Sequence, residues 1–370
     1  MHVSLIITHL GGGGAAKVVA NLAEGLSAYG IQVDIVQLRQ GREKFEVNES
    51  VRIIDIGASK VYYSIPTLIK YLNCECPDAV LSSVNTVNIV TLVATKLSSV
   101  SPRIVISEHN TLSVSTEASQ DIRTRLLPHL MRFTYPWADS IVTVSNGVAS
   151  DLRSFYPKIE ELISVIHNPV VTPRLIEKSE GVVNHDWFSD SQYCVILGVG
   201  ELVEQKDFPT LIRSFALVKK SVQNAKLVIL GEGQSREELT KLSKDIGVHD
   251  SIWMPGFVSN PYKYMSSADV FALSSRWEGL PTVLIEALAC GCPVVSTNCP
   301  SGPNEILDGG KYGELVPVGD VEKLAEAIIS VLNNSGPTSA GRADAFSYEK
   351  STREYIMELF PHRDGPEKVD

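Results

Sequence analysis

Short apolar runs alternate with helical patterns along most of the chain, and this alternation constrains the fold more than any other feature. Most runs are β-branched or leucine-rich with little polar alternation, as is typical of parallel strands that are buried on both faces. Helical patterns such as residues 16–29, 209–220 and 236–246 lie between the runs. A repeated strand–helix order predicts a doubly wound α/β fold. The expected strands are residues 3–8, 33–37, 79–82, 104–107, 140–144, 193–199, 226–230, 251–254, 270–273 and 293–296.

The length of 370 residues indicates more than one domain. The repeat stops near Asn168-Pro169 and resumes after a polar stretch that precedes residue 191. We therefore expect two Rossmann-like domains, residues 1–168 and 169–346, which face each other across a cleft. A helical pattern over residues 347–360 follows the second repeat, and we expect it to cross back onto the first domain. The polar residues 361–370 form the expected tail.

Charge and cysteine spacing exclude several classes of protein. The formal net charge is −10, with −1 in residues 1–170 and −9 in residues 171–370. An acidic second half argues against a nucleic acid as partner, because nucleic acids bind to basic surfaces. No run approaches the roughly 18 apolar residues of a membrane span, and the start lacks the basic leader of a signal peptide. The cysteines lack zinc-type spacing, so reduced thiols and a cytoplasmic location are expected.

The segment over residues 275–291 carries the clearest functional signal. Pro281 suits the first position of a helix and Gly291 suits its C-terminal cap. The helix between them is apolar almost all round, and Glu286 is its single charged residue. A carboxylate on a buried helix costs several kcal/mol unless it has a partner. That partner is either a ligand hydroxyl or an internal Arg or Lys, and both interpretations stay open.

Three further positions are candidates for ligand contacts. Glu278 precedes the same helix, where free backbone N–H groups and the helix dipole favour a phosphate. His109 follows an apolar strand, between Glu108 and Asn110, and the residues alone do not separate a functional histidine from a structural one. The glycines of residues 11–14 fit a close approach of backbone to a ligand. They do not form G-x-G-x-x-G, so a dinucleotide site is poorly supported.

Together these motifs resemble the retaining glycosyltransferases of family 4. Glu278 and Glu286 form the E-x7-E pattern of that family, within its E-G-x-P-x4-E form. The likeness continues in the glycine-rich first turn and in the segments 205–208, 231–233, 256–258 and 268–269. Residues 81–88 and 106–110 are similar to bacterial N-acetylgalactosamine transferases that extend polyprenyl-diphosphate-linked oligosaccharides or build surface polysaccharide. The resemblance implies the GT-B fold, with an acceptor-binding first domain and a nucleotide-sugar-binding second domain.

For the second domain, the resemblance implies a donor site. Glu286 would accept hydrogen bonds from the ribose, and Glu278 would hold hydroxyls of the donor sugar. The amides of Gly279 and Leu280 would lie near the sugar and the phosphate. Lys206 would neutralise the diphosphate, which suits a point charge on a flexible stem. Without the family pattern, a solvated surface position is the better interpretation of that lysine.

The resemblance implies further donor contacts outside the E-x7-E segment. Gly256 and Val258 would meet the nucleobase through main-chain groups, and Gly14 would approach the donor from the first domain. Two residues depart from the family pattern. Glu201 stands where family members commonly have Arg, and would repel a diphosphate. Ala16 occupies the Glu position of the family's G-G-A-E-R turn.

On the acceptor side, the resemblance places His109 beside the transferred sugar. Asn85, Asn88, Glu108 and Asn110 would line the same side. Catalytic roles are expected for His109, Lys206 and Glu278. We find no D-x-D motif. We therefore expect metal-independent, front-face transfer with retention of configuration, in which cationic side chains and helix dipoles stabilise the leaving diphosphate.

The expected partners are a nucleotide-sugar, which is a substrate rather than a cofactor, and a saccharide or lipid-linked saccharide acceptor. A UDP-sugar is favoured by the family likeness alone, and GDP-mannose stays open. Residues 121–137 combine basic and aromatic residues, which suits a peripheral contact with the inner face of the cytoplasmic membrane. The alternative is an amphipathic helix that packs on its own domain.

Two other functions stay open. A nucleotide-sugar epimerase on the same architecture would need acid and base groups at the donor's own ring, which E-x7-E does not suit. A non-catalytic nucleotide-sugar-binding protein is the second alternative, and it rests on Glu201. Acceptor-dependent release of a nucleoside diphosphate distinguishes these functions from a transferase.

Overall fold

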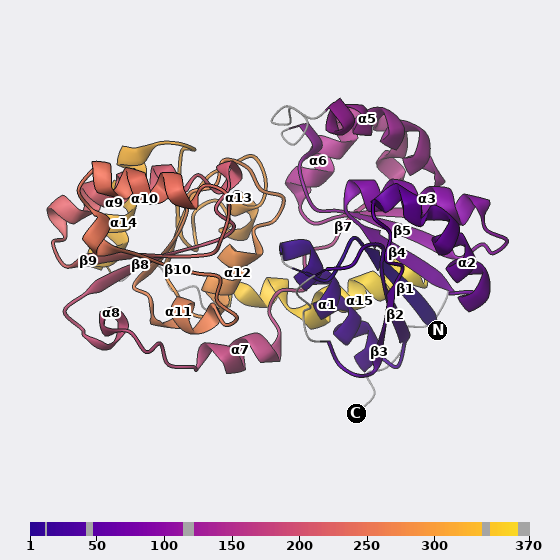
Figure 1. Cartoon of the computed structure of the whole chain (residues 1–370), viewed down its shortest axis with the longest axis horizontal. Helices are drawn as coiled ribbons and strands as arrows, with labels where there is room; N and C mark the ends of the chain where they lie inside the picture. Colours follow the sequence, from indigo (N-terminus) through magenta and orange to yellow (C-terminus); the bar gives the residue numbers. More distant parts are fainter. Residues whose placement is uncertain (12, 42–46, 114–121, 335–340, 362–370) are drawn as a thin grey trace. The chain divides into compact units, whose positions relative to one another are not determined.

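A computed structural model describes residues 1–370 except 12, 42–46, 114–121, 335–340 and 362–370 (Figure 1). The chain divides into two compact units. Unit 1 comprises Met1–Val170 together with Ser347–Asp370, and unit 2 comprises Val171–Phe346. The division falls between Val170 and Val171, whereas the sequence suggests a boundary near Asn168-Pro169. Each unit is a parallel sheet with helices interleaved along the chain, so the predicted doubly wound α/β fold is confirmed.

The sheet of unit 1 has seven strands in the order β3-β2-β1-β4-β5-β6-β7, and all its recorded pairs are parallel. The strands are β1 (His2–Ile7), β2 (Gln32–Gln37), β3 (Val51–Asp55), β4 (Ala79–Ser83), β5 (Arg103–Glu108), β6 (Ser140–Thr143) and β7 (Ile163–Val165). Strands β3 and β7 were not expected from the sequence. Both are edge strands. β7 has only three residues, and Val51 is the single buried residue of β3.

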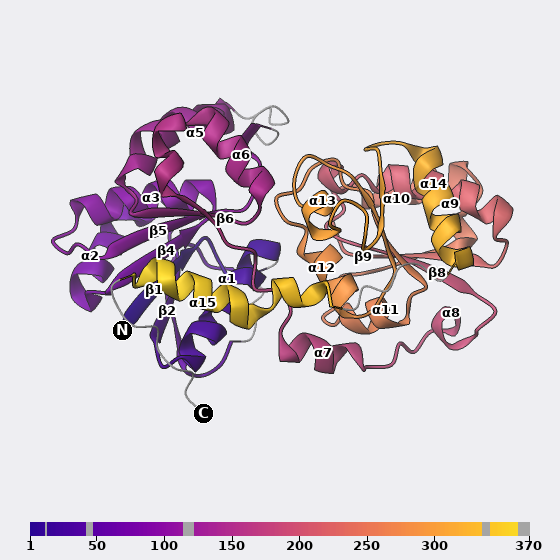
Figure 2. The ribbon, with the colours of Figure 1, turned by 180° about the vertical axis from the view of Figure 1, so that it is seen from behind.

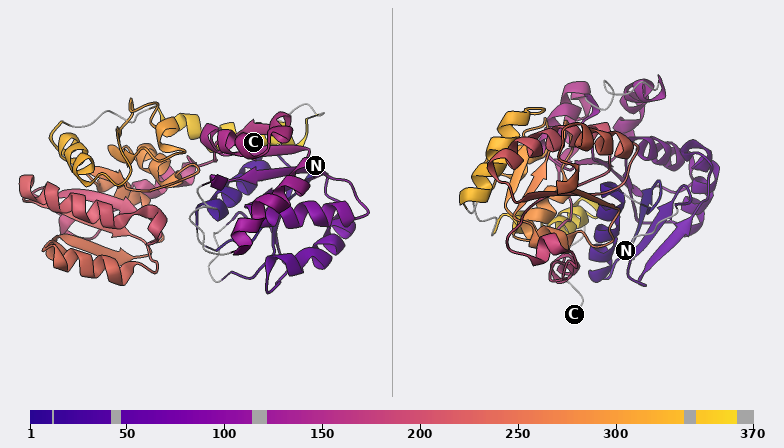
Figure 3. Two further views of the ribbon diagram at one scale, coloured as in Figure 1. Left: turned by 90° about the horizontal axis from the view of Figure 1, so that it is seen from above. Right: turned by 60° about the vertical axis from the view of Figure 1, so that its left-hand side comes forward.

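Helices cover both faces of the unit 1 sheet (Figures 1 and 3). They are α1 (Gly14–Ala28), α2 (Ile65–Glu75), α3 (Asn85–Leu97), α5 (Ile122–Thr134), α6 (Asn146–Phe155) and α15 (Tyr348–Leu359), with the short 3-10 turns η1 (Val61–Ser64), η2 (Tyr135–Trp137) and η3 (Pro157–Leu162). Successive strand residues point to opposite faces. Leu5 therefore packs with α1 and α15, while Ile6 packs with α2 and α3.

Helix α15 completes the core of unit 1, although it follows unit 2 in the sequence. It lies beside α1 on one face of the sheet (Figure 2). Tyr355, Ile356 and Leu359 are buried in the same cluster as Leu5 and Leu22. The helices approach closely because α1 has Gly25 at the contact, where a Cβ atom would lie 2.2 Å from Thr352 Oγ1.

The sheet of unit 2 has six strands in the order β10-β9-β8-β11-β12-β13. They are β8 (Cys194–Val199), β9 (Ala225–Leu230), β10 (Ile252–Gly256), β11 (Val270–Leu273), β12 (Val294–Thr297) and β13 (Glu314–Val316). The helices are α7 (Pro173–Ser179), α8 (Asp186–Ser189), α9 (Phe208–Ser221), α10 (Arg236–Asp245), α11 (Tyr262–Ser267), α12 (Thr282–Ala289), α13 (Pro303–Ile306) and α14 (Val321–Asn334). The 3-10 turns are η4 (Glu204–Lys206), η5 (His249–Ser251) and η6 (Ala343–Phe346). Strand β13, a three-residue edge strand, was also not expected.

The core of unit 2 lies between the sheet and the helices α9 and α14. Phe215, Leu227 and Ile328 are fully buried there. In a parallel sheet all strands end at the same edge, so the loops after β8, β9, β10 and β11 meet there. The predicted donor residues of unit 2 are in these loops and in the helix that follows β11.

Candidate functional site

Helix α12 presents the E-x7-E motif as the sequence suggests, with a one-residue shift at its start. Pro281 is the N-cap, with ψ 99°, and the helix begins at Thr282. At the other end Gly291 has φ +77°, and its N–H donates to the carbonyl of Leu288. Glu286 is 2% exposed, in the buried middle of the helix. Because this carboxylate is buried, it needs a partner, as the sequence predicts. The structure does not assign a ligand to it.

Glu278 and Lys206 form the central ion pair of the unit 2 site. Lys206 Nζ lies 2.5 Å from Glu278 Oε1, and Ser275 Oγ donates to the same oxygen at 2.7 Å. Gln205 Nε2 lies 3.5 Å from the other carboxylate oxygen. The side chains of Lys206 and Glu278 are only 18% and 8% exposed. A solvated surface position for Lys206, favoured by the residues alone, is therefore wrong: the ammonium is directed to a buried carboxylate.

The ion pair is aligned by hydrogen bonds between two loops. Ser274 Oγ donates to the carbonyl of Lys206 at 2.8 Å, and Gln205 Nε2 donates to the carbonyl of Trp277 at 2.9 Å. The backbone N–H of Arg276 donates to the carbonyl of Gln205 at 2.8 Å. Turn η4, after β8, and the loop after β11 are thus held together, and Lys206 reaches Glu278 from a fixed backbone.

A close backbone contact fixes the loop that contains Gly279 and Leu280. Ser301 Oγ donates to the carbonyl of Gly279 at 2.8 Å. Gly302 has φ +92°, and a Cβ atom there would lie 2.5 Å from Pro281 Cδ. Only glycine fits both the conformation and the space. The start of α12 is therefore held rigidly, next to Glu278.

The remaining donor residues lie at the end of β10 and on the loops after β8 and β10. Gly256 has φ +93°, and its carbonyl accepts from the N–H of Gly231 at 2.9 Å. Val258 follows, partly exposed. Glu201 is exposed, directly after Gly200, and the stem of Lys206 packs on Gly200. The structure therefore brings Lys206 and Glu278 together near the start of α12. Glu201 is next in sequence to Gly200, on which the stem of Lys206 packs.

In unit 1, His109 and Glu108 point to opposite faces of the sheet at the end of β5. His109 is partly buried on the face that α15 covers, where its Nε2 lies 3.2 Å from Ser107 Oγ. Loss of hydration lowers the pKa of His109 to about 4. The imidazole is therefore neutral at neutral pH, and it can act as a hydrogen-bond donor without carrying a charge.

Glu108 is buried on the other face, within a polar cluster. Asn88 Nδ2 donates to its Oε1 at 2.9 Å, and the hydroxyl of Tyr135 donates to the same oxygen. Ser82 Oγ donates to Asn88 Oδ1 at 2.8 Å. Burial raises the pKa of Glu108 to about 7, against the opposing effect of these hydrogen bonds. This cluster links β4, α3, β5 and η2.

The four predicted acceptor-side residues of unit 1 separate into two pairs. Asn88 is fully buried and Glu108 is 2% exposed, so neither side chain presents a surface to an acceptor in the described fold, and an acceptor-side role stays a prediction for both. Asn85 is partly exposed at the start of α3, and Asn110 is exposed. Contact with an acceptor remains a prediction for these two. Val84, before Asn85, has φ +82°, a rare conformation for a β-branched residue.

The glycine-rich turn after β1 leads directly into α1. Gly13 has φ +88° and is the N-cap, and Gly14 is the first helical residue. Gln37, at the end of β2, accepts from the N–H of Leu10 at 2.8 Å through Oε1, while its buried Nε2 has no hydrogen-bond partner among the residues that the structure describes. Gln37, Ser107 and Ser275 are site neighbours that the sequence did not indicate. Each of the three lies at or near the end of a strand, and this position in the sequence could have indicated that they are close to the site.

Helix α5 and the turn η2 that follows it together show two apolar faces in the part whose side chains are described. Asp121 lies outside the described residues, as do the side chains of 122–125. Met131 and Tyr135 are fully buried. The exposed apolar stripe comprises Leu126, Leu130, Phe133 and Trp137, which are 54%, 52%, 71% and 42% exposed. The amphipathic alternative therefore explains only the inner face. Among the described residues, no helix combines the length and the apolar character needed to cross a membrane.

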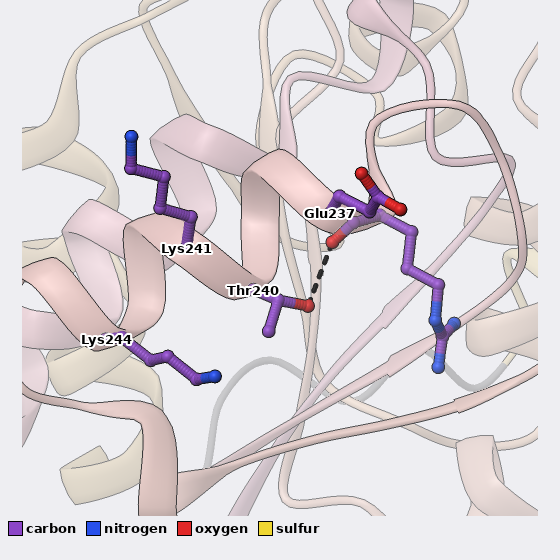
Figure 4. Close-up of a pocket in the computed structure, with 5 residues that line it drawn as sticks. Glu237, Thr240, Lys241 and Lys244 are labelled. Atoms are coloured by element: carbon purple, nitrogen blue, oxygen red, sulfur yellow. Dashed lines mark hydrogen bonds between the residues drawn. The ribbon is translucent and has the colours of Figure 1, made fainter.

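A hollow of about 380 Å³ lies on the surface of α10 (Figure 4). It is lined by Arg236, Glu237, Thr240, Lys241 and Lys244. Thr240 Oγ1 donates to the carbonyl of Arg236 at 2.9 Å within the helix. The predicted site residues are not among those that line the hollow.

Comparison with known proteins agrees with both units. Residues 12–174 match the model "Glycosyltransferase Family 4", and residues 185–350 match "Glycosyl transferases group 1". A relative from Campylobacter jejuni, N-acetylgalactosamine-N,N'-diacetylbacillosaminyl-diphospho-undecaprenol 4-alpha-N-acetylgalactosaminyltransferase, is 29% identical over 392 residues. The alignment covers 96% of this chain and 99% of that protein.

Two solved structures share the fold. Sucrose-phosphate synthase from Thermosynechococcus elongatus has a TM-score of 0.78 at 19% identity, with 96% and 97% of the chains covered. Alr3699/HepE of Anabaena, solved with UDP and glucose, has a TM-score of 0.73 at 18% identity, with 97% and 99% covered. The two Rossmann-like units therefore have the GT-B fold. With its two matched domains, the chain belongs to the glycosyltransferases that join a family 4 domain to a group 1 domain.

Proposed function

We propose that the chain transfers a hexose or N-acetylhexosamine from a UDP-sugar, with retention of configuration, to a polyprenyl-diphosphate-linked saccharide. The observation that carries this proposal is the buried Lys206–Glu278 pair beside the start of α12. The acceptor class is supported by the relative from Campylobacter jejuni, whose name specifies a diphospho-undecaprenol saccharide. The base is supported by the structure of HepE, which contains UDP.

In the proposed complex, the donor diphosphate replaces Glu278 as the partner of Lys206. The ammonium and the N-terminal end of α12 then stabilise the charge that develops on the leaving diphosphate. Glu278, released from the lysine, accepts hydrogen bonds from hydroxyls of the sugar, and Glu286 accepts them from the ribose. The exchange keeps the buried carboxylate and the ammonium partnered before and after binding, which avoids the cost of an unpaired buried charge.

The transfer itself needs no nucleophilic side chain and no metal ion. The bond between the anomeric carbon and the diphosphate oxygen breaks, and the acceptor hydroxyl attacks the same face of that carbon. Its proton passes to an oxygen of the leaving diphosphate. His109, neutral in the described fold, donates a hydrogen bond to the transferred sugar. Proton NMR of the product distinguishes this course from inversion, and an inverted linkage would remove the mechanism.

Calorimetric titration of UDP, GDP and ADP tests the donor site. We expect the wild type to bind UDP and Glu286→Ala to lose that binding. Glu326→Ala is the matched control, because Glu326 is exposed and pairs only with the exposed Lys323 in the described contacts. If GDP binds in place of UDP, the proposed base is wrong. If no nucleotide binds the wild type, the exposed Glu201 has disabled the diphosphate site, and a non-catalytic function is favoured.

Release of UDP that depends on an acceptor distinguishes the transferase from the two alternatives. An epimerase converts the donor without an acceptor and releases no diphosphate. A non-catalytic binding protein leaves the donor intact. A disaccharide attached to polyprenyl diphosphate is the appropriate acceptor, with the free disaccharide as a second substrate that measures the contribution of the lipid.

We further propose that the exposed stripe of α5 contacts the membrane in which the lipid-linked acceptor is embedded. Apolar side chains at positions 126, 130, 133 and 137 recur with helical spacing, and Arg132 is exposed beside them, as suits an interfacial helix. Co-sedimentation with anionic liposomes tests this. We expect Leu126→Ser/Phe133→Ser to reduce binding, and Leu97→Ser, at an isolated exposed leucine, to leave it unchanged. Equal binding of all three proteins would exclude the membrane contact.

A further inference from the structure

A hydrogen-bonded path leads from the C-terminal helix to the imidazole of His109. Tyr355 Oη lies 3.4 Å from Ser107 Oγ, although the two residues are 248 positions apart in the sequence. Ser107 Oγ lies 3.2 Å from His109 Nε2. Both Tyr355 and Ser107 are 1% exposed, whereas His109 retains some exposure. The path therefore begins in the core of unit 1 and ends at a ring that can reach a ligand.

The strand geometry explains why these groups meet. Ser107 and His109 are two positions apart at the end of β5, so both side chains point to the same face of the sheet. That face is covered by α1 and α15, and Tyr355 is packed in its core. Helix α15 is held on the sheet by Glu358, whose carboxylate accepts from Ser140 Oγ at 2.7 Å and Ser164 Oγ at 2.6 Å. Glu358 lies one helical turn from Tyr355, so the phenol is held in place.

We propose that Ser107 and Tyr355 are positioning residues, which fix His109 in the tautomer that has its ring hydrogen on Nδ1. The effect of this tautomer on catalysis rests on the proposed function, whereas the tautomer itself does not depend on it. With Nε2 accepting from Ser107, the ring presents its Nδ1–H as the donor for a sugar hydroxyl.

The direction of the hydrogen bonds follows from the donors that are present. Burial raises the pKa of Tyr355 to about 12, so the phenol keeps its hydrogen, and a buried hydroxyl needs an acceptor. Ser107 Oγ is the acceptor that the described contacts provide. Ser107 then directs its own hydrogen to Nε2. Because the imidazole is neutral, the single ring hydrogen is on Nδ1.

The tautomer is measured by ¹⁵N NMR of protein labelled at histidine. His109→Gln identifies the signals of His109. We expect the wild type to show a protonated Nδ1 and an unprotonated Nε2. Ser107→Ala and Tyr355→Phe should shift His109 toward a mixture of both tautomers. Tyr29→Phe is the control, because it removes the 2.9 Å hydrogen bond from Arg353 on the same helix without touching the path. A protonated Nε2 in the wild type, or spectra unchanged in both variants, would overturn the proposal.

Kinetics give the second readout. In Ser107→Ala and Tyr355→Phe we expect kcat to fall by about 3- to 10-fold, the effect of one hydrogen bond, while KM for the donor stays constant. Tyr29→Phe should retain the wild-type kcat. Tyr355→Phe keeps the shape of the core, so it remains informative if Ser107→Ala unfolds. If the wild type transfers no sugar, the proposed function fails while the NMR result still decides the tautomer. If transfer is normal and the spectra do not change, only the positioning roles fail.

Discussion

Lys206 and Glu278 neutralise each other at a place in unit 2 where either charge alone would be costly. A diphosphate that binds Lys206 must therefore compete with Glu278, and the sugar hydroxyls must satisfy the carboxylate that is released. Tight binding of the donor therefore requires both its diphosphate, which pairs with Lys206, and its sugar, which pairs with Glu278. It also predicts that free UDP binds more weakly than the complete donor, since UDP offers nothing to Glu278.

Lys206→Ala should weaken UDP binding by roughly 10- to 100-fold, the range for a hydrogen bond to a charged group. The loss includes the repulsion between the diphosphate and the Glu278 carboxylate, whose charge Lys206 no longer neutralises. Calorimetry measures the affinity, with Lys323→Ala as the control, since Lys323 forms an exposed pair with Glu326. Wild-type affinity in Lys206→Ala would exclude Lys206 from the donor site.

Glu108 should make the stability of the fold depend on pH. Its pKa is about 7 in the folded chain against an ordinary value of 4.5. Its contribution to stability is fully present below 4.5 and is lost as pH rises through the folded pKa, because the folded state binds the proton more tightly. Between about pH 5 and about pH 8, the free energy of unfolding of the wild type should therefore decrease by ~1–3 kcal/mol more than that of Glu108→Gln. Urea unfolding at both pH values measures this. Parallel curves for the two proteins would contradict it.

At the scale of elements, the contact between α1 and α15 depends on Gly25. A Cβ atom at this position would lie 2.2 Å from Thr352 Oγ1 and 3.2 Å from its Cβ. Gly25→Ala should thus destabilise the protein by about 1–3 kcal/mol, as overpacking does, although alanine is intrinsically the better helix former. Thermal unfolding measures the loss. Gly25→Ala/Thr352→Ala is the control, and it should recover part of the stability because the Oγ1 clash is gone. An unchanged or higher melting temperature in the single variant would show that the helices separate without cost.

The strands and helices differ in how clearly their sequences mark them. Central strands such as β1 and β4 were predicted because they are continuous apolar runs. Strands β7 and β13 were missed because each has only three residues, and β3 was missed because four of its five residues are partly or fully exposed. The helix with Glu286 was predicted from its cap residues and its single charge. Lys206 was assigned from family likeness only, since an ion pair 72 positions apart leaves no local pattern. Tyr355 was missed for the same reason.

At the scale of the whole molecule, each unit has its own hydrophobic core, and the last helix belongs to the first of them. Leu359 is 1% exposed in the core of unit 1. Leu359→Ala should destabilise unit 1 by about 2–5 kcal/mol, the usual cost of a cavity. Hydrogen exchange with mass spectrometry should then show faster exchange in β1, β2 and β4, with unit 2 unchanged.

Ile328→Ala is the reciprocal control, because Ile328 is fully buried in the core of unit 2. It should accelerate exchange in β8 and β9 and leave β1 protected. If either variant accelerates exchange equally throughout the chain, the two units unfold as a single cooperative body, and the division at Val170 and Val171 has no energetic counterpart.

The place of α15 in the chain has a consequence for how the protein is made. A ribosome releases residues 1–170 first, then the whole of unit 2, and only afterwards the helix that closes the first core. Domains generally fold as units during synthesis. Here the first unit emerges incomplete, with the faces of Leu5 and Leu22 that receive α15 uncovered, while the second can fold completely. Unit 1, most of which precedes unit 2 in the chain, is thus the unit that is completed last. His109 has both Ser107 and Tyr355 on its hydrogen-bonded path only after that final step.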